Sequence, residues 1–324
     1  MILVTGASGL VGSHLITKLL QDGKQVRALY RSNLPPVISK NIDWFKADIL
    51  DVVALDEAMQ GITQVFHCAA IVSFNHKENE LLHKTNVEGT ANVVNACLNN
   101  TIEKLLFVSS VASLGRANGN TIINESSKWI ESSNNSAYAK SKYLAEMEVW
   151  RGIGEGLNAV IINPSIILGN SDWTKGSAAI FKSAYDEFAW YTTGVNGFVD
   201  VQDVVNAMVQ LMNSPIEAQR FIVSAENSSY QNVFTEIALA FGKQIPQKIV
   251  TPFLAAIVWR LEAIKGLITG SKPLLTKETA HTAQTKIYYD NAKLLKALPT
   301  FTYSNLVNSI ERICKELQER YQLK

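Results

Sequence analysis

Residues 5–12 are Thr5-Gly6-Ala7-Ser8-Gly9-Leu10-Val11-Gly12, and this stretch decides the fold. An apolar β-branched run begins at Ile2 directly before it, and a helical pattern of leucines and isoleucine follows it. Glycines spaced in this way between a strand and a helix are typical of a turn that holds a dinucleotide. The first allows a tight turn, the second lets the backbone approach a pyrophosphate, and the third lets the helix pack closely on the strand. We expect the cofactor to contact Gly6, Ser8, Gly9, Leu10, Val11 and Gly12.

Short β-branched runs alternate with helical periodicity through the first half of the chain, which predicts right-handed βαβ units and a parallel sheet. The expected strands are 2–5, 25–30, 42–46, 64–68, 104–109 and 159–163, and the longest expected helix is 79–99. The predicted fold is therefore α/β, a doubly wound Rossmann-type parallel sheet with a smaller, mostly helical C-terminal lobe. We expect residues 1–165 to form the dinucleotide-binding domain, with 197–213 returning to it, and 166–324 to form the substrate-binding lobe.

Composition excludes several classes of protein. The chain has 324 residues, 47% of them hydrophobic and 18% charged, and a net charge of +1, so a buried core is expected and a nucleic acid partner is not. Three scattered cysteines predict neither a disulfide framework nor a metal site, and we expect no metal. With no room for a leader before the first strand, a cytoplasmic location is expected. The apolar segment 253–268 contains charges and predicts an amphipathic helix, not a membrane span.

The end of the second strand indicates which dinucleotide is bound. A carboxylate there favours NAD, but residues 28–32 are Ala-Leu-Tyr-Arg-Ser and contain no acid. Arg31 offers a guanidinium suited to a 2′-phosphate, so NADP(H) is favoured and NAD(H) remains an alternative if Arg31 is only a solvated surface residue. Asp48, after the third strand, is placed either to bind the adenine amino group or to cap the next helix.

Tyr138 and Lys142 are four residues apart, and so on one face of a helix that covers 137–150. A nearby ammonium favours the phenolate form of tyrosine, and we expect Lys142 to lower the pKa of Tyr138 toward the working range. Spacing alone is weak evidence, because Tyr289 and Lys293 match it too. Context favours the first pair, which follows the glycine loop and a strand that ends in two serines.

Several motifs in order make the chain resemble an extended short-chain dehydrogenase/reductase. They are residues 5–12, Phe66-His-Cys-Ala-Ala70, Asn86-Val-Glu-Gly-Thr90, Phe107-Val-Ser-Ser110, the tyrosine and lysine, Asn163-Pro-Ser-Ile-Ile-Leu-Gly169 and Phe198-Val-Asp-Val-Gln-Asp203. The resemblance is greatest to the branch of dihydroflavonol and cinnamoyl-CoA reductases and 3β-hydroxysteroid dehydrogenases. One departure is Asn170, where relatives usually have proline.

This resemblance implies that Ser110, Tyr138 and Lys142 are the catalytic residues, with Ser109 and Ser113 as possible substitutes for Ser110. It also implies hydride transfer at the nicotinamide, a small-molecule substrate and a monomer or a homodimer paired through 79–99 and 137–151. The further residues expected to bind the cofactor are Ile49, Ala69, Ala70, Asn86, Ser109, Tyr138, Lys142, Pro164, Ser165 and Ile166.

The expected substrate is apolar or aromatic. A sugar nucleotide brings two phosphate charges, but Lys182 is the only basic residue between 176 and 201, a stretch that is rich in aromatic residues. Candidates for the pocket wall are Ser73, Phe74, Trp173, Phe181, Tyr185 and Tyr191. The alternative is that most of these rings pack in the core or in a lid.

The leading hypothesis is an NADP(H)-dependent carbonyl reductase or alcohol dehydrogenase of small apolar molecules. One alternative is a nucleotide-sugar epimerase or dehydratase that keeps NAD tightly bound. Another is a non-catalytic dinucleotide-binding interaction protein.

Overall fold

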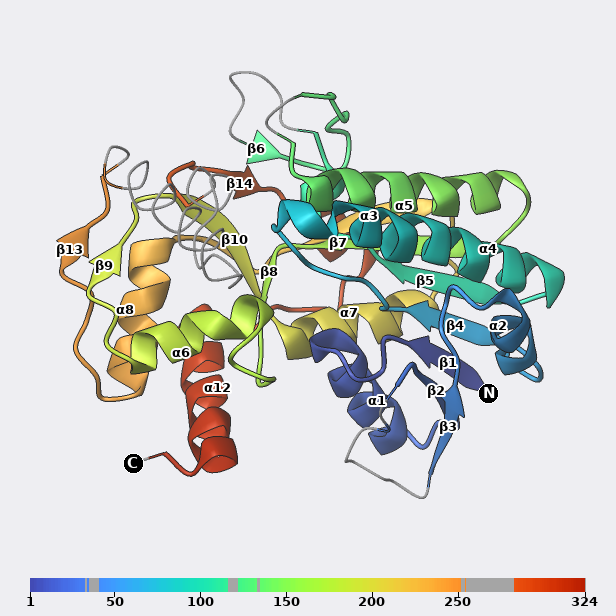
Figure 1. Cartoon of the computed structure of the whole chain (residues 1–324), viewed down its shortest axis with the longest axis horizontal. Coiled ribbons are helices and arrows are strands. Elements are labelled where there is room, and N and C mark those ends of the chain that lie inside the picture. Colours follow the sequence, from blue (N-terminus) through green and yellow to red (C-terminus); the bar gives the residue numbers. More distant parts are fainter. Residues whose placement is uncertain are drawn as a thin grey trace.

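Seven parallel strands form the central sheet, in the order β11-β7-β5-β4-β1-β2-β3 (Figure 1). The computed structural model describes residues 1–32, 34, 41–115, 122–132, 135–251, 254 and 283–323. The helix expected over 253–268 lies outside them, apart from residue 254. The strands of the sheet are β1 (Ile2–Thr5), β2 (Val26–Tyr30), β3 (Ile42–Lys46), β4 (Gln64–His67), β5 (Lys104–Val108), β7 (Ala159–Pro164) and β11 (Gln219–Val223). The predicted doubly wound fold is confirmed.

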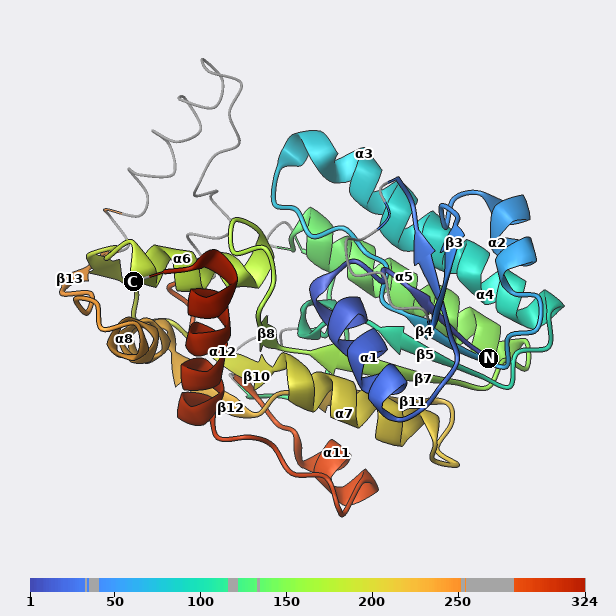
Figure 2. The same cartoon turned by 90° about the horizontal axis from the view of Figure 1, so that it is seen from below.

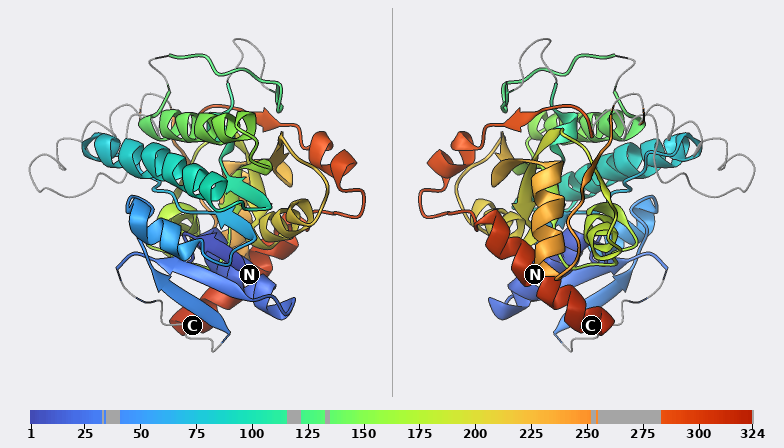
Figure 3. Two further views of the ribbon diagram at one scale, coloured as in Figure 1. Left: turned by 90° about the vertical axis from the view of Figure 1, so that its right-hand side faces the viewer. Right: turned by 90° about the vertical axis from the view of Figure 1, so that its left-hand side faces the viewer.

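Helices cover both faces of this sheet, because alternate residues of each strand point to opposite sides. Leu106 packs with α1 (Leu10–Gln21), α7 (Val201–Met212) and α11 (Ala292–Ala297). Its neighbours Leu105 and Phe107 pack with α2 (Val52–Ala58), α4 (Gly89–Asn99) and α5 (Ala137–Gly154). Figure 2 shows α1 and α7 side by side on the first face, and both end views in Figure 3 show α4 and α5 together on the other.

The long helix expected over 79–99 is interrupted in the structure. It consists of α3 (Asn79–Leu82), the π-helical segment η2 (His83–Glu88) and α4. A π segment carries one extra residue per turn and is often found at functional sites. Here it contains Asn86, whose side chain is buried and binds elements on either side.

A second lobe follows β7 and has its own core. Its larger sheet is β12-β10-β8, its helices pack around the buried Phe181, and its last helix has Asn305 as N-cap. The elements are β8 (Ile166–Leu168), η4 (Gly176–Ala178), α6 (Ala179–Tyr185), β9 (Trp190–Tyr191), β10 (Val195–Asp200), β12 (Glu226–Ser229), α8 (Tyr230–Ala240), β13 (Lys248–Ile249) and α12 (Leu306–Tyr321).

The chain crosses between the two lobes more often than a boundary at 165/166 implies. Helix α7 packs on α1, within the expected return over 197–213. Strand β11 also belongs to the large sheet, where it pairs with β7, although the sequence placed it in the second lobe. The remaining short elements are η1 (His76–Glu78), η3 (Val111–Ser113), β6 (Ile122–Ile123) and β14 (Tyr288–Tyr289). In the described residues, no helix is both long and apolar enough to cross a membrane.

Lys104 joins the sheet to the end of α7, and its replacement tests that contact. Its buried ammonium donates hydrogen bonds to the carbonyl oxygens of Leu211 and Ser214, both at 2.7 Å. Lys104→Met leaves these carbonyls without the charge-assisted bonds, and we expect the free energy of unfolding in urea to fall by about 1–3 kcal/mol. The control Lys18→Met removes an exposed pair with Asp22 and should change it by less than about 0.5 kcal/mol.

Candidate active site

The glycine loop is held so closely by its neighbours that two of its glycines admit no side chain. Gly6 has φ +65°, and a Cβ there would lie 2.6 Å from the Ala69 nitrogen. A Cβ on Gly12 would lie 2.3 Å from the Gly6 carbonyl oxygen. The end of β1, the start of α1 and the end of β4 therefore meet at backbone distance.

Gly9 differs from these two, because its own surroundings leave space. A Cβ there would have one close neighbour, the Gly6 oxygen at 3.2 Å. Gly9 is exposed and is the N-cap of α1, so it has no side chain with which to cap the helix. An uncapped helix N-terminus presents free amides and a positive dipole end to an anion. The loop thus fits the pyrophosphate of a dinucleotide.

A series of buried, hydrogen-bonded side chains holds the start of the glycine loop in place. His67 accepts or donates at both ring nitrogens, 2.7 Å from the Thr5 hydroxyl and 3.0 Å from that of Thr90. The Thr5 hydroxyl also accepts the Ala69 amide at 3.1 Å. Burial and the charge of Lys142 lower the pKa of His67 to about 3, so this histidine is neutral at physiological pH. Its role is structural.

The residues expected at the adenosine end lie on two neighbouring strand ends. Arg31 is exposed directly after β2. Asp48 follows β3, and its Oδ1 accepts the Leu50 amide at 3.0 Å. The alternative role of Asp48 as helix cap is wrong, because Asp51 is the N-cap of α2. Ile49 is buried under Gly89, and its carbonyl accepts a hydrogen bond from Asn92.

Tyr138 lies in the first turn of α5, which Ser136 caps by accepting the Ala139 amide at 2.8 Å. Burial raises the pKa of Tyr138 above its usual value, and a hydrogen bond with the Ser110 side chain opposes that shift. Ser110 in turn accepts the Ala112 amide at 3.1 Å and begins η3 at the end of β5. The structure therefore brings the expected serine and tyrosine into direct contact.

Lys142 lies one turn further along α5, on the same face. Its ammonium donates to the Val108 carbonyl at 2.8 Å and lies 4.5 Å from the centre of the Phe107 ring. Burial lowers the pKa of Lys142 to about 8, a shift that the charge of Glu146 opposes. The expected lowering of the Tyr138 pKa by Lys142 is wrong here, because burial of the phenol outweighs the other effects.

Ser109 and Ser113 do not take the place of Ser110. Both hydroxyls lie against the Glu146 carboxylate, at 2.7 and 2.8 Å. Ser109, expected at the cofactor, is thus engaged with a buried acid. Glu146 is the residue of this centre that the sequence reasoning missed, although its place four residues after Lys142 on the same helix face was a usable signal.

Other expected cofactor residues lie around this centre. Asn86 accepts the Ile71 amide at 2.8 Å and donates to the Ser141 hydroxyl at 2.9 Å, which ties the loop after β4 to α5. Ala69 and Ala70 form that loop. Pro164 ends β7 and Ile166 begins β8, and the buried Ser165 hydroxyl between them has no partner among the described residues. An unsatisfied buried hydroxyl at this edge fits a polar ligand.

The expected pocket residues divide into two groups. Phe74 contacts Tyr138 edge to face, with ring centres 5.9 Å apart, and Ser73 lies in the same loop, where it accepts the Asn75 amide. By contrast, three aromatic residues pack with leucines, isoleucines and other aromatic rings in the core of the second lobe: Trp173, Phe181 and Tyr185. Tyr191 is half-buried in β9, and its place in the pocket stays a prediction.

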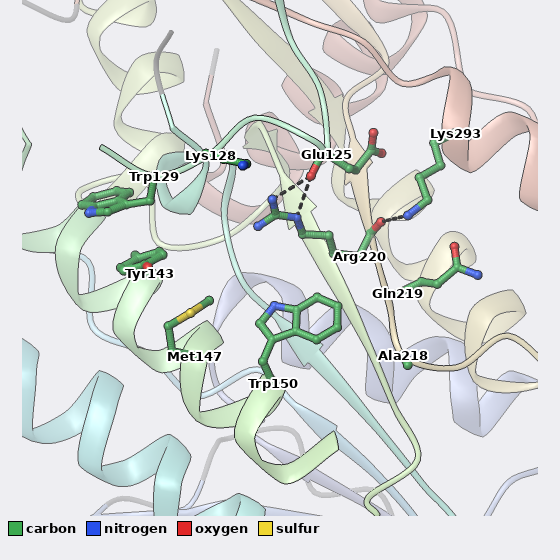
Figure 4. Close-up of a pocket in the computed structure, with 10 residues that line it drawn as sticks. All are labelled: Glu125, Lys128, Trp129, Tyr143, Met147, Trp150, Ala218, Gln219, Arg220 and Lys293. Carbon is green, nitrogen blue, oxygen red and sulfur yellow. Dashed lines mark hydrogen bonds between the residues drawn. The ribbon is translucent and has the colours of Figure 1, made fainter. Parts of the chain in front are cut away.

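A cavity of about 590 Å³ lies elsewhere, between α5 and β11 (Figure 4). Tyr143, Met147 and Trp150 of α5 point toward it. At 100° per residue, these positions lie on a different side of α5 from Tyr138. This cavity is therefore separate from the Tyr138 site. In the part of the chain that the structure describes, no group of three or more His, Cys, Asp or Glu residues could hold a metal ion.

The chain is similar to known members of a dinucleotide-binding enzyme family. Residues 2–223 match the NAD dependent epimerase/dehydratase family. The chain is 31% identical over 305 residues to a Synechocystis sp. protein named "Putative dihydroflavonol 4-reductase", covering 91% of this chain and 88% of that one. It is 28% identical to cinnamoyl-CoA reductase 1 of Petunia hybrida, covering 76% and 78%. The solved structure of gox2253 superposes with a TM-score of 0.84 and 26% identity, covering 100% and 99%.

Alanine substitutions at Gly12 and Gly9 should distinguish a glycine needed for backbone packing from a glycine needed for cofactor binding. Gly12→Ala forces a Cβ against the Gly6 carbonyl, and we expect loss of thermal stability or of soluble protein. Gly9→Ala meets only one contact at 3.2 Å, so its melting temperature should stay near that of the wild type. We expect its dinucleotide affinity, measured by calorimetry, to fall by about tenfold or more, because the methyl group blocks the phosphate. Wild-type affinity in folded Gly9→Ala would contradict this assignment.

Proposed function

Because the chain belongs to the NAD dependent epimerase/dehydratase family, we propose that it is an NADP(H)-dependent reductase of small apolar or aromatic carbonyl compounds. The family and its reductase relatives identify it as an NAD(P)-dependent oxidoreductase of the extended short-chain dehydrogenase/reductase type. The choice of NADP(H), the substrate class and the roles of individual residues form the proposal.

The observation that supports the proposal most is the contact between Tyr138 and Ser110. This contact lies at the same edge of the sheet as the glycine loop. When bound, the nicotinamide supplies or accepts a hydride at its C4 atom. Ser110 polarises the substrate oxygen, and the Tyr138 hydroxyl delivers the proton to it. Burial raises the pKa of Tyr138, so the phenol holds the proton that this step transfers.

The residues that hold the cofactor in this proposal follow the edge of the sheet. The glycine loop and the amides of α1 bind the pyrophosphate, and Asp48 lies within the region of the adenine. Lys142 binds the nicotinamide ribose, with two ammonium hydrogens beyond the one donated to Val108. The unsatisfied Ser165 hydroxyl lies at the nicotinamide end.

The charges near the site favour an uncharged substrate. Lys182, the one basic residue of 176–201, forms an exposed ion pair with Asp186, so this stretch offers a diphosphate a single cation that already has a carboxylate partner. Phe74 meets Tyr138 edge to face and offers an apolar wall beside the proposed proton donor. A phosphate-bearing sugar would find less favourable contacts there.

Tyr138→Phe is the direct test of the mechanism. Removing the hydroxyl removes the proton donor, so we expect kcat with NADPH and aromatic aldehydes or ketones to fall about 10²–10⁴-fold. NADPH affinity should change little. The control Tyr143→Phe alters a tyrosine of the same helix that stacks on Trp129, 4.6 Å between ring centres, and should keep wild-type kcat.

Two results would overturn the proposal. One is full turnover by Tyr138→Phe. The other is a wild-type protein that retains NAD through purification, ignores carbonyl compounds and converts UDP-sugars, since an epimerase returns the hydride to its substrate.

Arg31→Ala tests the cofactor preference. We expect the KM for NADPH to rise about tenfold or more and that for NADH to stay within about twofold, because only NADPH carries the 2′-phosphate that Arg31 would bind. Lys24→Ala, an exposed cation before the same strand, is the control and should change neither. An equal effect on both cofactors, or none on NADPH, would contradict the role of Arg31.

A further inference from the structure

A buried carboxylate, Glu146, lies beneath the catalytic serine and is not part of the mechanism above. Its side chain has no exposed surface. One oxygen, Oε2, is close to three groups: the Ser109 hydroxyl at 2.7 Å, the Ser113 hydroxyl at 2.8 Å and the Asn163 amide nitrogen at 2.8 Å. These groups come from the ends of β5 and β7 and from η3, so one atom joins three segments.

Two of these groups also hold the backbone of Ser110. The Ser113 hydroxyl lies 2.8 Å from the Ser110 carbonyl oxygen, and the Asn163 amide nitrogen lies 3.2 Å from it. Ser110 itself begins η3, with its hydroxyl turned toward Tyr138. The Ser113 hydroxyl has one hydrogen for two acceptors, this carbonyl and Glu146, whereas the Asn163 amide has two hydrogens and bonds both at once. The position of the Ser110 hydroxyl therefore depends on the Glu146 carboxylate through Asn163, with the Ser113 hydroxyl within hydrogen-bond distance of both.

The second oxygen of Glu146 is held by a fixed cation. Oε1 accepts from Arg220 Nη1 at 2.9 Å. The remaining guanidinium nitrogens donate to the carbonyl oxygens of Glu125, at 2.6 and 3.0 Å, and Ser127, at 3.2 Å, and Figure 4 shows Arg220 pointing to Glu125. Burial alone would raise the pKa of Glu146, but the Ser109 hydrogen bond and Arg220 together hold it below the usual value. Glu146 is therefore charged.

An amide replaces this carboxylate only if the groups around it rearrange. Arg220 Nη1 is an obligate donor at Oε1, while the Ser109 and Ser113 hydroxyls and Asn163 Nδ2 donate to Oε2. A glutamine with its NH₂ group at Oε1 would meet the guanidinium, and one with its NH₂ group at Oε2 would require the hydroxyls and the Asn163 amide to reverse. A buried donor left unsatisfied costs about 1–3 kcal/mol, enough to shift a loop.

From this geometry we propose that Glu146, with Arg220 as its counter-ion, is a positioning residue that sets Ser110 for catalysis. The inference rests on the proposed function, in which Ser110 polarises the substrate oxygen. Glu146 acts through Ser113 and Asn163, without touching substrate or cofactor.

The charge of Glu146 also acts on Lys142. The pKa of Lys142 is therefore a readout that a purely structural role of Glu146 would not affect. The other titratable groups around Lys142 are His67, Cys68 and Tyr138. Burial lowers the pKa of His67 to about 3 and raises the pKa of Cys68 to about 12. It also raises the pKa of Tyr138. All three groups are therefore uncharged between pH 5 and 9. Glu146 favours the ammonium form of Lys142, whose pKa is about 8. Neutralising Glu146 should lower that value further.

Glu146→Gln is the test, with Glu148→Gln as the matched control on the same helix, where Glu148 pairs with Arg151 at the surface. For folded Glu146→Gln we expect kcat to fall about tenfold or more and NADPH affinity to stay within about threefold, because the loss is confined to Ser110. The alkaline limb of the kcat profile should move to lower pH, since Lys142 loses its proton earlier. Glu148→Gln should change none of these quantities.

A double-mutant cycle at pH 6, where Lys142 remains protonated, isolates the Ser110 contribution. If Glu146 acts through Ser110, adding Glu146→Gln to Ser110→Ala should lower kcat by less than about threefold. A crystal structure of the single variant gives a readout independent of turnover, in which the Ser110 hydroxyl is displaced from Tyr138. If Glu146→Gln does not fold, Ser113→Ala replaces it and should lower kcat about threefold or more, because it removes one link to Ser110.

Wild-type kcat with an unmoved alkaline limb in folded Glu146→Gln would overturn the inference, as would full additivity with Ser110→Ala or unchanged kcat in Ser113→Ala. These outcomes leave the proposed function intact. Absence of carbonyl reduction by the wild-type protein overturns the proposed function, and this inference with it.

Discussion

The approach of α1 to the end of β1 is the constraint on which the rest of the site depends. Backbone meets backbone where a Cβ on Gly12 would lie 2.3 Å from the Gly6 oxygen. That closeness directs the first amides of α1 toward the edge of the sheet, where the ends of β4, β5 and β7 also lie. The three groups proposed for catalysis, Ser110, Tyr138 and Lys142, come from the end of β5 and from the start of α5.

A second network, centred on Glu146, links the same strand ends from inside the protein. It joins α5, which carries Tyr138 and Lys142, to the loop of Ser110 and to Arg220 on the edge strand β11. Burying a charge pair is costly and gives little net stability by itself. Its presence beside the loop of Ser110 supports the proposed positioning role, because many donors around one carboxylate allow few alternative arrangements.

The sequence predicted the sheet well because local patterns carried the information. The six strands expected before Pro164 all appear. Less was predictable for aromatic residues. Phe181 reads equally as pocket wall or core, and only packing decides that its ring is buried. The same limit applies to the Tyr138 pKa, since burial of the phenol depends on residues far away in the chain.

The sequence alone determined the βαβ architecture, the glycine loop and the candidacy of Tyr138 and Lys142, because these depend on residue types at short spacing, while the family resemblance indicated Ser110. Tertiary structure decided that β11 joins the large sheet, that Ser109 and Ser113 turn to Glu146, and that the Lys142 ammonium binds the Val108 carbonyl. Those contacts join residues 33 to 59 positions apart, from Ser113 and Glu146 to the paired residues Ile161 and Arg220. Periodicity reports which face of an element is buried, but only the folded chain fixes which polar groups share that interior.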